Sequence, residues 1–196
     1  MKKTLIAAIL ATLSISAQAD QPITSPDSFI HGQYTFRDSI ASDKDQPNRQ
    51  GINLTVGRNI GYGIQLDGGV QVRNENGFSG RDTTRLETGA TYQFGLTQDV
   101  TLYTRGALGY KLTDQEDSTY YSIEPGIRFQ ATPALNLRAG YRYRTAFSDS
   151  IFDKTNTVRL GAEYSLSKTQ SLTAGVDRFY GDNETLGVNL GYIVRF

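Results

Sequence analysis

The final stretch of the chain alternates between apolar and small or polar side chains. Apolar residues occupy every second position from Leu186 to Phe196, polar residues such as Asn189 and Arg195 fall between them, and only Ile193 breaks the polar side. A two-residue period is that of a β-strand, because successive side chains of a strand point to opposite faces. One face is therefore apolar over about ten residues, the length that a tilted strand needs to cross a bilayer. The alternative from this stretch alone is an edge strand of a soluble β-sandwich.

Nine further stretches show the same alternation and are separated by segments rich in Gly, Asn, Asp, Ser or Pro. Such segments typically bound β-strands. The connections alternate between longer and shorter ones, as in up-and-down transmembrane barrels. The longer connections are predicted at 38–50, 74–82, 113–118, 146–156 and 181–184. The predicted strands span 29–37, 52–57, 62–73, 85–94, 101–112, 120–130, 135–144, 157–166, 172–179 and 185–196.

The last strand resembles that of bacterial outer-membrane β-barrels, in which alternating apolar residues lead to a terminal Phe that the barrel-assembly machinery reads. The matching residues are Val188, Leu190, Tyr192, Val194 and Phe196. The resemblance implies an all-β, transmembrane, antiparallel up-and-down barrel in the outer membrane of a Gram-negative bacterium. We expect ten strands, with eight as the alternative, a monomer, both termini in the periplasm, and lipid and lipopolysaccharide as surroundings. No cofactor and no nucleic-acid partner are expected.

The amino terminus is typical of a cleaved secretory signal peptide. Lys2 and Lys3 precede an apolar run, and a small-residue motif ends at Ala19. We therefore expect residues 1–19 to be removed and residues 20–196 to form one barrel domain. The chain has no cysteine, so neither a lipid-anchored cysteine nor a disulfide framework is expected. No later stretch approaches the about 20 unbroken apolar residues of a transmembrane helix.

Placing the outward aromatic residues by strand direction sorts them into two belts, with aliphatic residues between them. Amphipathic rings favour the two headgroup levels of a membrane, whereas a soluble sandwich has no reason to sort its aromatics. The belt predicted near the outer rim holds Tyr34, Phe36, Tyr110, Tyr121, Tyr141, Tyr143 and Phe179. The belt predicted near the inner rim holds Tyr62, Tyr92, Phe94, Phe129, Tyr164, Tyr192 and Phe196.

Two positions disturb the pattern. Pro125 lies within a predicted strand, where it cannot donate to the ladder, so we expect a bulge there. Arg178 falls on the apolar side of its strand and Phe179 on the polar side, which predicts a register shift near the rim.

The inward phase carries more basic than acidic residues. The predicted lumen-lining basic residues are Arg37, Arg73, Arg85, Arg105, Lys111, Arg128, Arg138, Arg142, Arg144, Arg159 and Arg195. The predicted acidic ones are Asp67, Glu87, Glu124, Glu163 and Asp177. Buried charges need partners. The strand order makes Glu124–Arg142, Glu87–Arg105 and Asp177–Arg159 candidate pairs, while it sets Arg128 opposite Arg138.

Surplus arginine predicts a positive path for small anionic solutes. The run 138–144, with Arg128 and Arg159 on flanking strands, resembles the porins for acidic oligosaccharides, whose pores are lined by arginines. Those porins resemble twelve-stranded barrels, however. Ten strands leave a narrow passage at most, since eight are filled by their own side chains. The alternative is a plugged structural or surface-interaction barrel without conductance.

An enzymatic barrel is the least favoured hypothesis. Outer-membrane proteases of the omptin type resemble a ten-stranded barrel, and the lipid A deacylases and palmitoyltransferases resemble this chain in size. All of them need a histidine at the reacting site. The one histidine, His31, is predicted inward and far from the outer rim, so we interpret it as a satisfied lumen group. The scattered loop carboxylates lack calcium-loop spacing, so no metal site is expected.

Overall fold

The computed structural model describes residues 28–39, 49–75, 82–113, 117–147, 154–180 and 184–196. The predicted signal peptide and the centres of the five predicted longer connections lie outside these ranges. Within them, no helix is long and apolar enough to cross a membrane.

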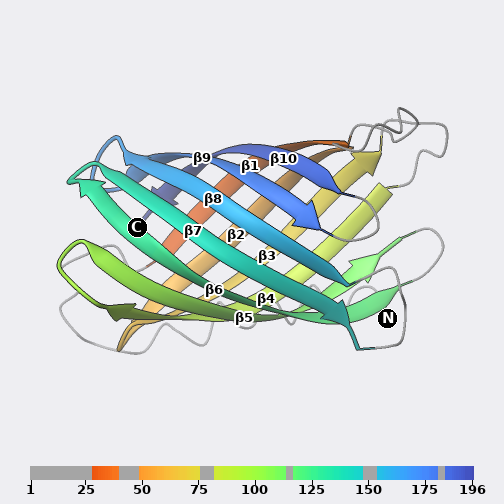
Figure 1. The fold of residues 1–196 in the computed structure, drawn as a ribbon, viewed down its shortest axis with the longest axis horizontal. Coiled ribbons are helices and arrows are strands. Elements are labelled where there is room, and N and C mark those ends of the chain that lie inside the picture. The colour runs from red at the N-terminus through yellow and green to blue at the C-terminus, as the bar shows by residue number, and fades with distance from the viewer. Residues whose placement is uncertain (1–27, 40–48, 76–81, 114–116, 148–153, 181–183) are drawn as a thin grey trace.

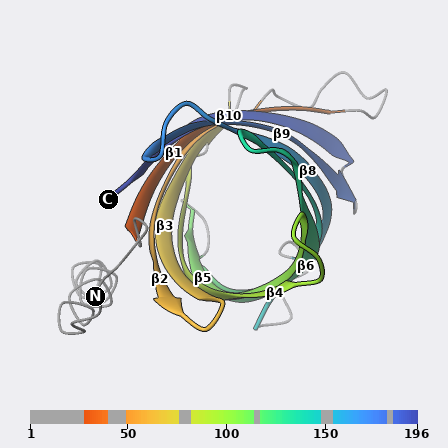
Figure 2. The ribbon, with the colours of Figure 1, turned by 90° about the vertical axis from the view of Figure 1, so that its left-hand side faces the viewer.

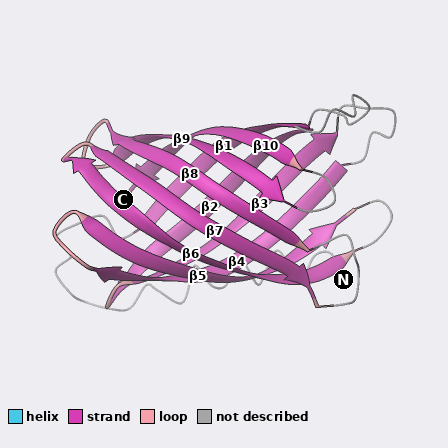
Figure 3. Ribbon diagram, in the orientation of Figure 1, coloured by secondary structure: helices cyan, strands magenta, loops and turns pink. Residues whose placement is uncertain are grey.

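The described residues form ten antiparallel strands that close into one barrel, as Figures 1 and 3 show. Closure is direct, because β1 pairs with β10 from Phe29↔Arg195 to Ser39↔Thr185. The prediction of ten strands is thus confirmed and the alternative of eight is wrong. The strands are β1 (Ser28–Ser39), β2 (Arg49–Gly61), β3 (Ile64–Glu75), β4 (Asp82–Gly95), β5 (Val100–Leu112), β6 (Ser118–Thr132), β7 (Leu135–Ala146), β8 (Thr155–Ser165), β9 (Gln170–Tyr180) and β10 (Thr185–Arg195).

The barrel has two distinct ends. The four short turns and the C-terminus lie at the left in Figure 1, and we call this the turn end. At the opposite end, the loop end, the longer connections join the strands. Figure 2 views the closed ring of strands from the turn end.

Side-chain exposure follows the predicted alternation. Along β6, buried and exposed residues alternate from Ser118 to Pro125. Leu108 on β5 is 57% exposed on the outside, whereas its neighbour Ala107 is 6% exposed and faces the lumen. The apolar residues therefore cover the outer face, which is the arrangement of a barrel surrounded by lipid.

The structure corrects the bulge expected at Pro125. β6 and β7 pair as Ile123↔Tyr143 and again as Gly126↔Gly140, which is the same register on both sides of the proline. The missing N–H therefore interrupts the ladder without inserting an extra residue. The irregularity of this strand pair lies instead between Gln130 and Thr132, beside the turn.

The register shift predicted near Arg178 and Phe179 is also wrong. β8 and β9 pair without interruption through Thr157↔Phe179. Arg178 points outward at the rim and forms an ion pair with Glu184 (3.3 Å), so its charge stays in a polar environment. Phe179 faces the lumen, where the guanidinium of Arg37 lies 3.5 Å from its ring centre. Phe179 therefore does not belong to the outward aromatic belt.

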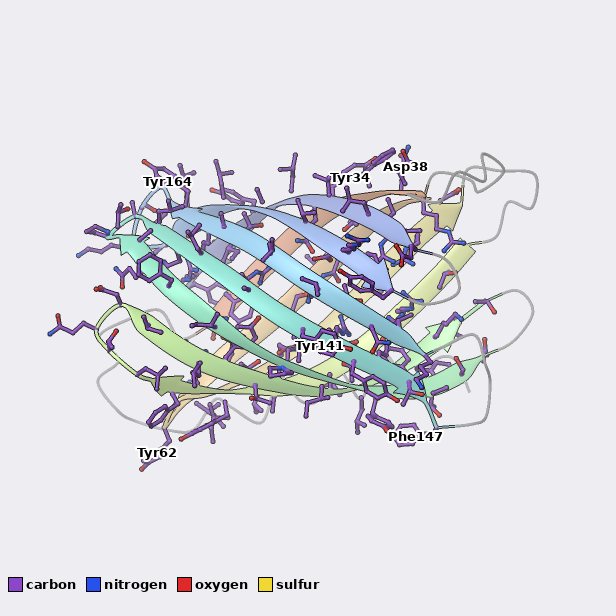
Figure 4. The ribbon with its side chains drawn as sticks, viewed as in Figure 1. Tyr34, Asp38, Tyr62, Tyr141, Phe147 and Tyr164 are labelled. Carbon is purple, nitrogen blue, oxygen red and sulfur yellow. The ribbon has the colours of Figure 1, made fainter. Side chains whose placement is uncertain are left out.

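β3, which follows the turn after β2, begins later than predicted. Gly61, Tyr62 and Gly63 all have positive φ angles (88°, 54° and 74°), so β3 starts at Ile64. Tyr62 is 95% exposed at this turn. Figure 4 shows Tyr62 and Tyr164 toward the turn end and Tyr34 and Phe147 toward the loop end. Aromatic side chains thus mark both ends of the outer surface.

The residues predicted as an assembly signal share one face of the last strand. All five are more than a third exposed on the outside of β10 or directly after it. These are Val188, Leu190, Tyr192, Val194 and Phe196.

Candidate functional site

The lumen contains a cavity of about 590 Å³ whose lining includes residues of all ten strands. The lining reaches from Asn59 and Asn136 near the turn end to Arg37 and Thr155 near the loop end. Among the described residues, nine arginines and five carboxylates line it, which leaves an excess of positive charge. The basic residues are Arg37, Arg85, Arg105, Arg128, Arg138, Arg142, Arg144, Arg159 and Arg195, and the acidic ones are Asp67, Glu87, Glu124, Glu163 and Asp177.

One group of side chains, the Glu87 cluster, crosses the middle of the lumen. It consists of Asp67, Glu87, Arg105, Tyr120 and Arg142. Arg105 donates to Asp67 through Nε (3.0 Å) and Nη2 (2.5 Å) and to Glu87 through Nη1 (2.7 Å). Glu87 also accepts hydrogen bonds from Arg142 and from the hydroxyl of Tyr120 (3.0 Å). Because β4 and β7 are not neighbours in the barrel, the Glu87–Arg142 ion pair links distant parts of the wall.

A second group, the Glu124 cluster, joins β5, β6, β8 and β9. It consists of Tyr103, Glu124, Arg159 and Asp177. Glu124 accepts hydrogen bonds from the Tyr103 hydroxyl (3.2 Å) and from Arg159 Nη1 (2.8 Å). Arg159 Nε also donates to Asp177 (3.3 Å). Each ionised carboxylate therefore has a charged or hydroxyl donor, which offsets its removal from bulk water.

Two of the predicted pairs form and one does not. Glu87–Arg105 and Arg159–Asp177 are ion pairs. Arg128 and Arg138 face each other across β6 and β7, as predicted. The expected Glu124–Arg142 pair does not form, because Glu124 binds Arg159 while Arg142 reaches Glu87.

Near the turn end, Arg195 forms an ion pair with Glu163 and donates to Ser171 Oγ (2.8 Å). His31 Nε2 shares a hydrogen bond with Thr173 Oγ1 (3.1 Å). Among the described residues, this hydrogen bond joins the histidine to a hydroxyl group rather than to a carboxylate of the kind that orients a catalytic base. Across the described ranges, no group of three or more His, Cys, Asp or Glu side chains could hold a metal ion.

Several lumen arginines lie against aromatic rings. Arg37 lies over Phe179, Arg144 lies 5.3 Å from the ring centre of Tyr120, and Arg128 lies 5.4 Å from that of Tyr103. Cation–π contacts of this kind hold a guanidinium without neutralising it. The surplus charge is therefore retained in the lumen.

The remaining predicted basic residues differ in position. Arg138 lies over Gly161. A Cβ atom at Gly161 would be only 2.6 Å from Arg138 Nε. Arg73 is buried and donates to Gln71 (3.2 Å), but it does not line the cavity. Lys111 lies opposite Arg85 on the neighbouring strand and also falls outside the cavity lining.

Two lumen tyrosines form an aromatic core that sequence reasoning did not single out. Tyr120 and Tyr103 are 2% and 7% exposed. A Cβ atom at Gly109 would lie 2.2 Å from the Tyr120 ring, and one at Gly126 would lie 2.4 Å from the Tyr103 ring. The rings therefore occupy space that only glycine leaves free. The sequence signal for this packing was an inward glycine opposite each inward tyrosine on the neighbouring strand.

Several solved barrels match the chain, two of them with a TM-score above 0.5. An outer-membrane channel from Pseudomonas putida F1 shares 10% identity at a TM-score of 0.57, covering 91% of this chain and 100% of that chain. The β domain of the Bordetella autotransporter BrkA shares 12% identity at a TM-score of 0.57, covering 88% and 100%. The KdgM porin in complex with disordered oligogalacturonate shares 12% identity at a TM-score of 0.47, covering 86% and 99%. No curated protein sequence matches the chain.

The match to a family agrees with this architecture. The family model of the outer membrane protein beta-barrel domain matches residues 5–193, nearly the whole chain. Closed antiparallel topology, an apolar outer face and a charged lumen are the features of such a barrel in its membrane. The resemblance inferred from the last strand is confirmed, and the chain belongs to the outer membrane protein beta-barrel domain family.

Proposed function

We propose that the protein is a narrow outer-membrane channel that prefers small anionic solutes. The observation that carries this proposal is the cavity that extends between the two ends of the barrel, with nine arginines and five carboxylates in its lining. A surplus of fixed positive charge in a low-dielectric wall concentrates anions and repels cations. The same surplus therefore sets the preference of any solute path through this lumen.

The two central clusters limit the size of the solute. The Glu87 cluster joins β3, β4, β5, β6 and β7, and the Glu124 cluster joins β5, β6, β8 and β9. Both fill part of the cross-section with ordered side chains. We therefore propose that only small anions pass. The Pseudomonas putida barrel of similar fold is an outer membrane channel, and we extend that role to this chain as part of the proposal.

The ion pairs across the lumen favour one second candidate. If the clusters never open, the protein is a plugged barrel with a structural or surface-interaction role. In both cases we propose periplasmic termini, a monomer in lipid and lipopolysaccharide, and insertion through the barrel-assembly machinery.

Single-channel recording in planar lipid bilayers tests the channel. In a KCl gradient, we expect conductance steps whose reversal potential has the same sign as the equilibrium potential of chloride. Arg138→Gln removes one cavity-lining charge and should move the reversal potential toward zero. Arg178→Gln removes a charge from the outer face and should leave it unchanged. Absence of steps would establish the plugged barrel instead, and a potential of the sign set by potassium would refute anion preference.

A further inference from the structure

Four arginines occupy one level of the barrel near the loop end. Arg37, Arg73, Arg85 and Arg144 each lie two or three residues inside the loop end of their strands, β1, β3, β4 and β7. Arg73 and Arg85 are buried, and Arg37, Arg85 and Arg144 line the cavity. We call this set the loop-end arginine cluster.

The guanidinium groups of this cluster act on one another. Arg37 interacts electrostatically with Arg73, Arg85 and Arg144, and Arg144 also interacts with Arg85. Mutual repulsion between like charges destabilises the barrel unless an opposite charge comes near. Several positive charges therefore act on one another in this part of the lumen.

The described carboxylates that act on Arg37 and Arg144 are already bound elsewhere. Asp177 acts on Arg37 and Glu87 acts on Arg144, but Asp177 is paired with Arg159, and Glu87 with Arg105 and Arg142. In the part of the chain that the structure describes, Arg37 and Arg144 contact aromatic rings and form no ion pair. Within the described ranges, the charges of Arg37 and Arg144 are thus not neutralised by an ion pair.

Hydrogen-bond donors are also left over beside the cavity. Among the described residues, Arg37 Nε and Arg142 Nε are buried and have no hydrogen-bond partner. A guanidinium carries five N–H donors in a planar fork that matches the oxygens of phosphate and carboxylate groups. Arg37 therefore brings both a charge without an ion pair among the described residues and an unpartnered donor to the loop end of the lumen.

We propose that the loop-end arginine cluster is a saturable binding site for a phosphoryl group. A phosphate monoester carries about −1.5 to −2 charges at neutral pH and three strong acceptor oxygens. It therefore offsets several guanidinium charges at once, which a chloride ion does not. The proposal deepens the proposed function, on which it rests, by naming the class of anion that the channel would hold: a free phosphate, a phosphorylated small molecule or the phosphate of a glycolipid.

Calorimetric titration of the folded, detergent-solubilised protein with inorganic phosphate at constant ionic strength tests the site. We expect saturable binding that weakens about tenfold or more in Arg37→Gln and in Arg144→Gln, since a hydrogen bond to a charged group contributes about 1.5–3 kcal/mol. The matched control is Arg178→Gln, which removes a β9 charge at the same end but on the outer face, and should bind like the wild type. Two separate cluster variants keep the test decisive if one of them fails to fold.

Two further measurements identify the source of the phosphate and separate this proposal from the channel. Lipopolysaccharide micelles are titrated with and without their phosphate groups, and inorganic phosphate is added during chloride recordings. If inorganic phosphate competes with lipopolysaccharide that carries its phosphate groups, and lipopolysaccharide without them does not bind, the site is assigned to a glycolipid. Phosphate binding without any conductance would refute the channel and leave the site. Anion-selective conductance with no phosphate binding, or with equal binding in the variants and the control, would refute the site and leave the channel.

Discussion

Removing the charge of Glu87 should destabilise the barrel. Glu87 accepts hydrogen bonds from Arg105 (2.7 Å), Arg142 and Tyr120 (3.0 Å), and so it connects β4 to three other strands. Glu87→Gln keeps the shape of the side chain but removes its charge. Arg142 then loses its one ion pair among the described residues, and Arg105 keeps Asp67 alone.

The expected loss follows from the burial of the groups. Breaking a fully buried ion pair costs about 3–5 kcal/mol, because one charge stays buried without its partner. Here the side chains of Glu87 and Arg142 are 17% and 19% exposed, and a glutamine can still accept one hydrogen bond. We therefore expect a loss of about 2 kcal/mol, which lowers the folding equilibrium constant about 30-fold.

Urea titration in lipid vesicles, followed by circular dichroism, measures this loss. The matched control is Glu184→Gln. Glu184 forms an ion pair with Arg178 at the protein surface, and 46% of its side chain is exposed. An exposed pair contributes about 0–1 kcal/mol. If the free energy of unfolding of Glu87→Gln lies within about 0.5 kcal/mol of the wild-type value, the clusters do not hold the barrel together and our reasoning on them is wrong.

Two other predictions concern the two faces of the wall. Gly126→Ala should lose about 1–3 kcal/mol in the same titration, because its Cβ would lie 2.4 Å from the Tyr103 ring, whereas Gly106→Ala has open space and should change little; equal losses would contradict the packing of the tyrosine against the glycine. A fluorophore attached to a cysteine at Leu108 should be quenched by brominated lipid, and one at Ala107 should be shielded from it. Equal quenching at the two sites would contradict the assignment of faces.

The strand count and the facing of most residues could be predicted, because both follow from a period of two. A residue inside a strand has its face set by parity alone, so Glu87, Arg105 and Arg142 were placed in the lumen from the sequence. The pairing of neighbouring strands followed from the short turns. Arg128 therefore faced Arg138 as expected.

Contacts across the lumen could not be predicted in the same way. Strand order specifies which residues are adjacent in the wall, but an arginine side chain is long enough to reach past its neighbour. Glu124 lies in register with Arg142 but binds Arg159, two strands along the sheet. Which long side chain reaches which carboxylate depends on the curvature of the whole barrel and on the space left by Tyr103 and Tyr120.

The errors near the rim have a different cause. Sequence reasoning expected aromatic residues on the lipid face and charges in the lumen at this strand, and so it interpreted Arg178 and Phe179 as signs of a register shift. At the end of β9 this rule reverses, since Arg178 can reach solvent and Glu184 from the outer face, while Phe179 supports Arg37 from inside. A rule based on hydrophobicity holds only where hydrocarbon lies outside the wall.

The position of the charges links the stability of the barrel to its passage. In the centre of the lumen, carboxylates and arginines are paired and hold distant strands together, as Glu87 and Arg142 do. Toward the loop end, Arg37 and Arg144 contribute charge without an ion pair among the described residues. The same side chains cannot be removed from the centre without both widening the path and weakening the wall. We therefore propose that charges outside the centre, at the loop end and at Arg138, can change selection for anions with less effect on the fold, and that the central clusters set the resistance to flow.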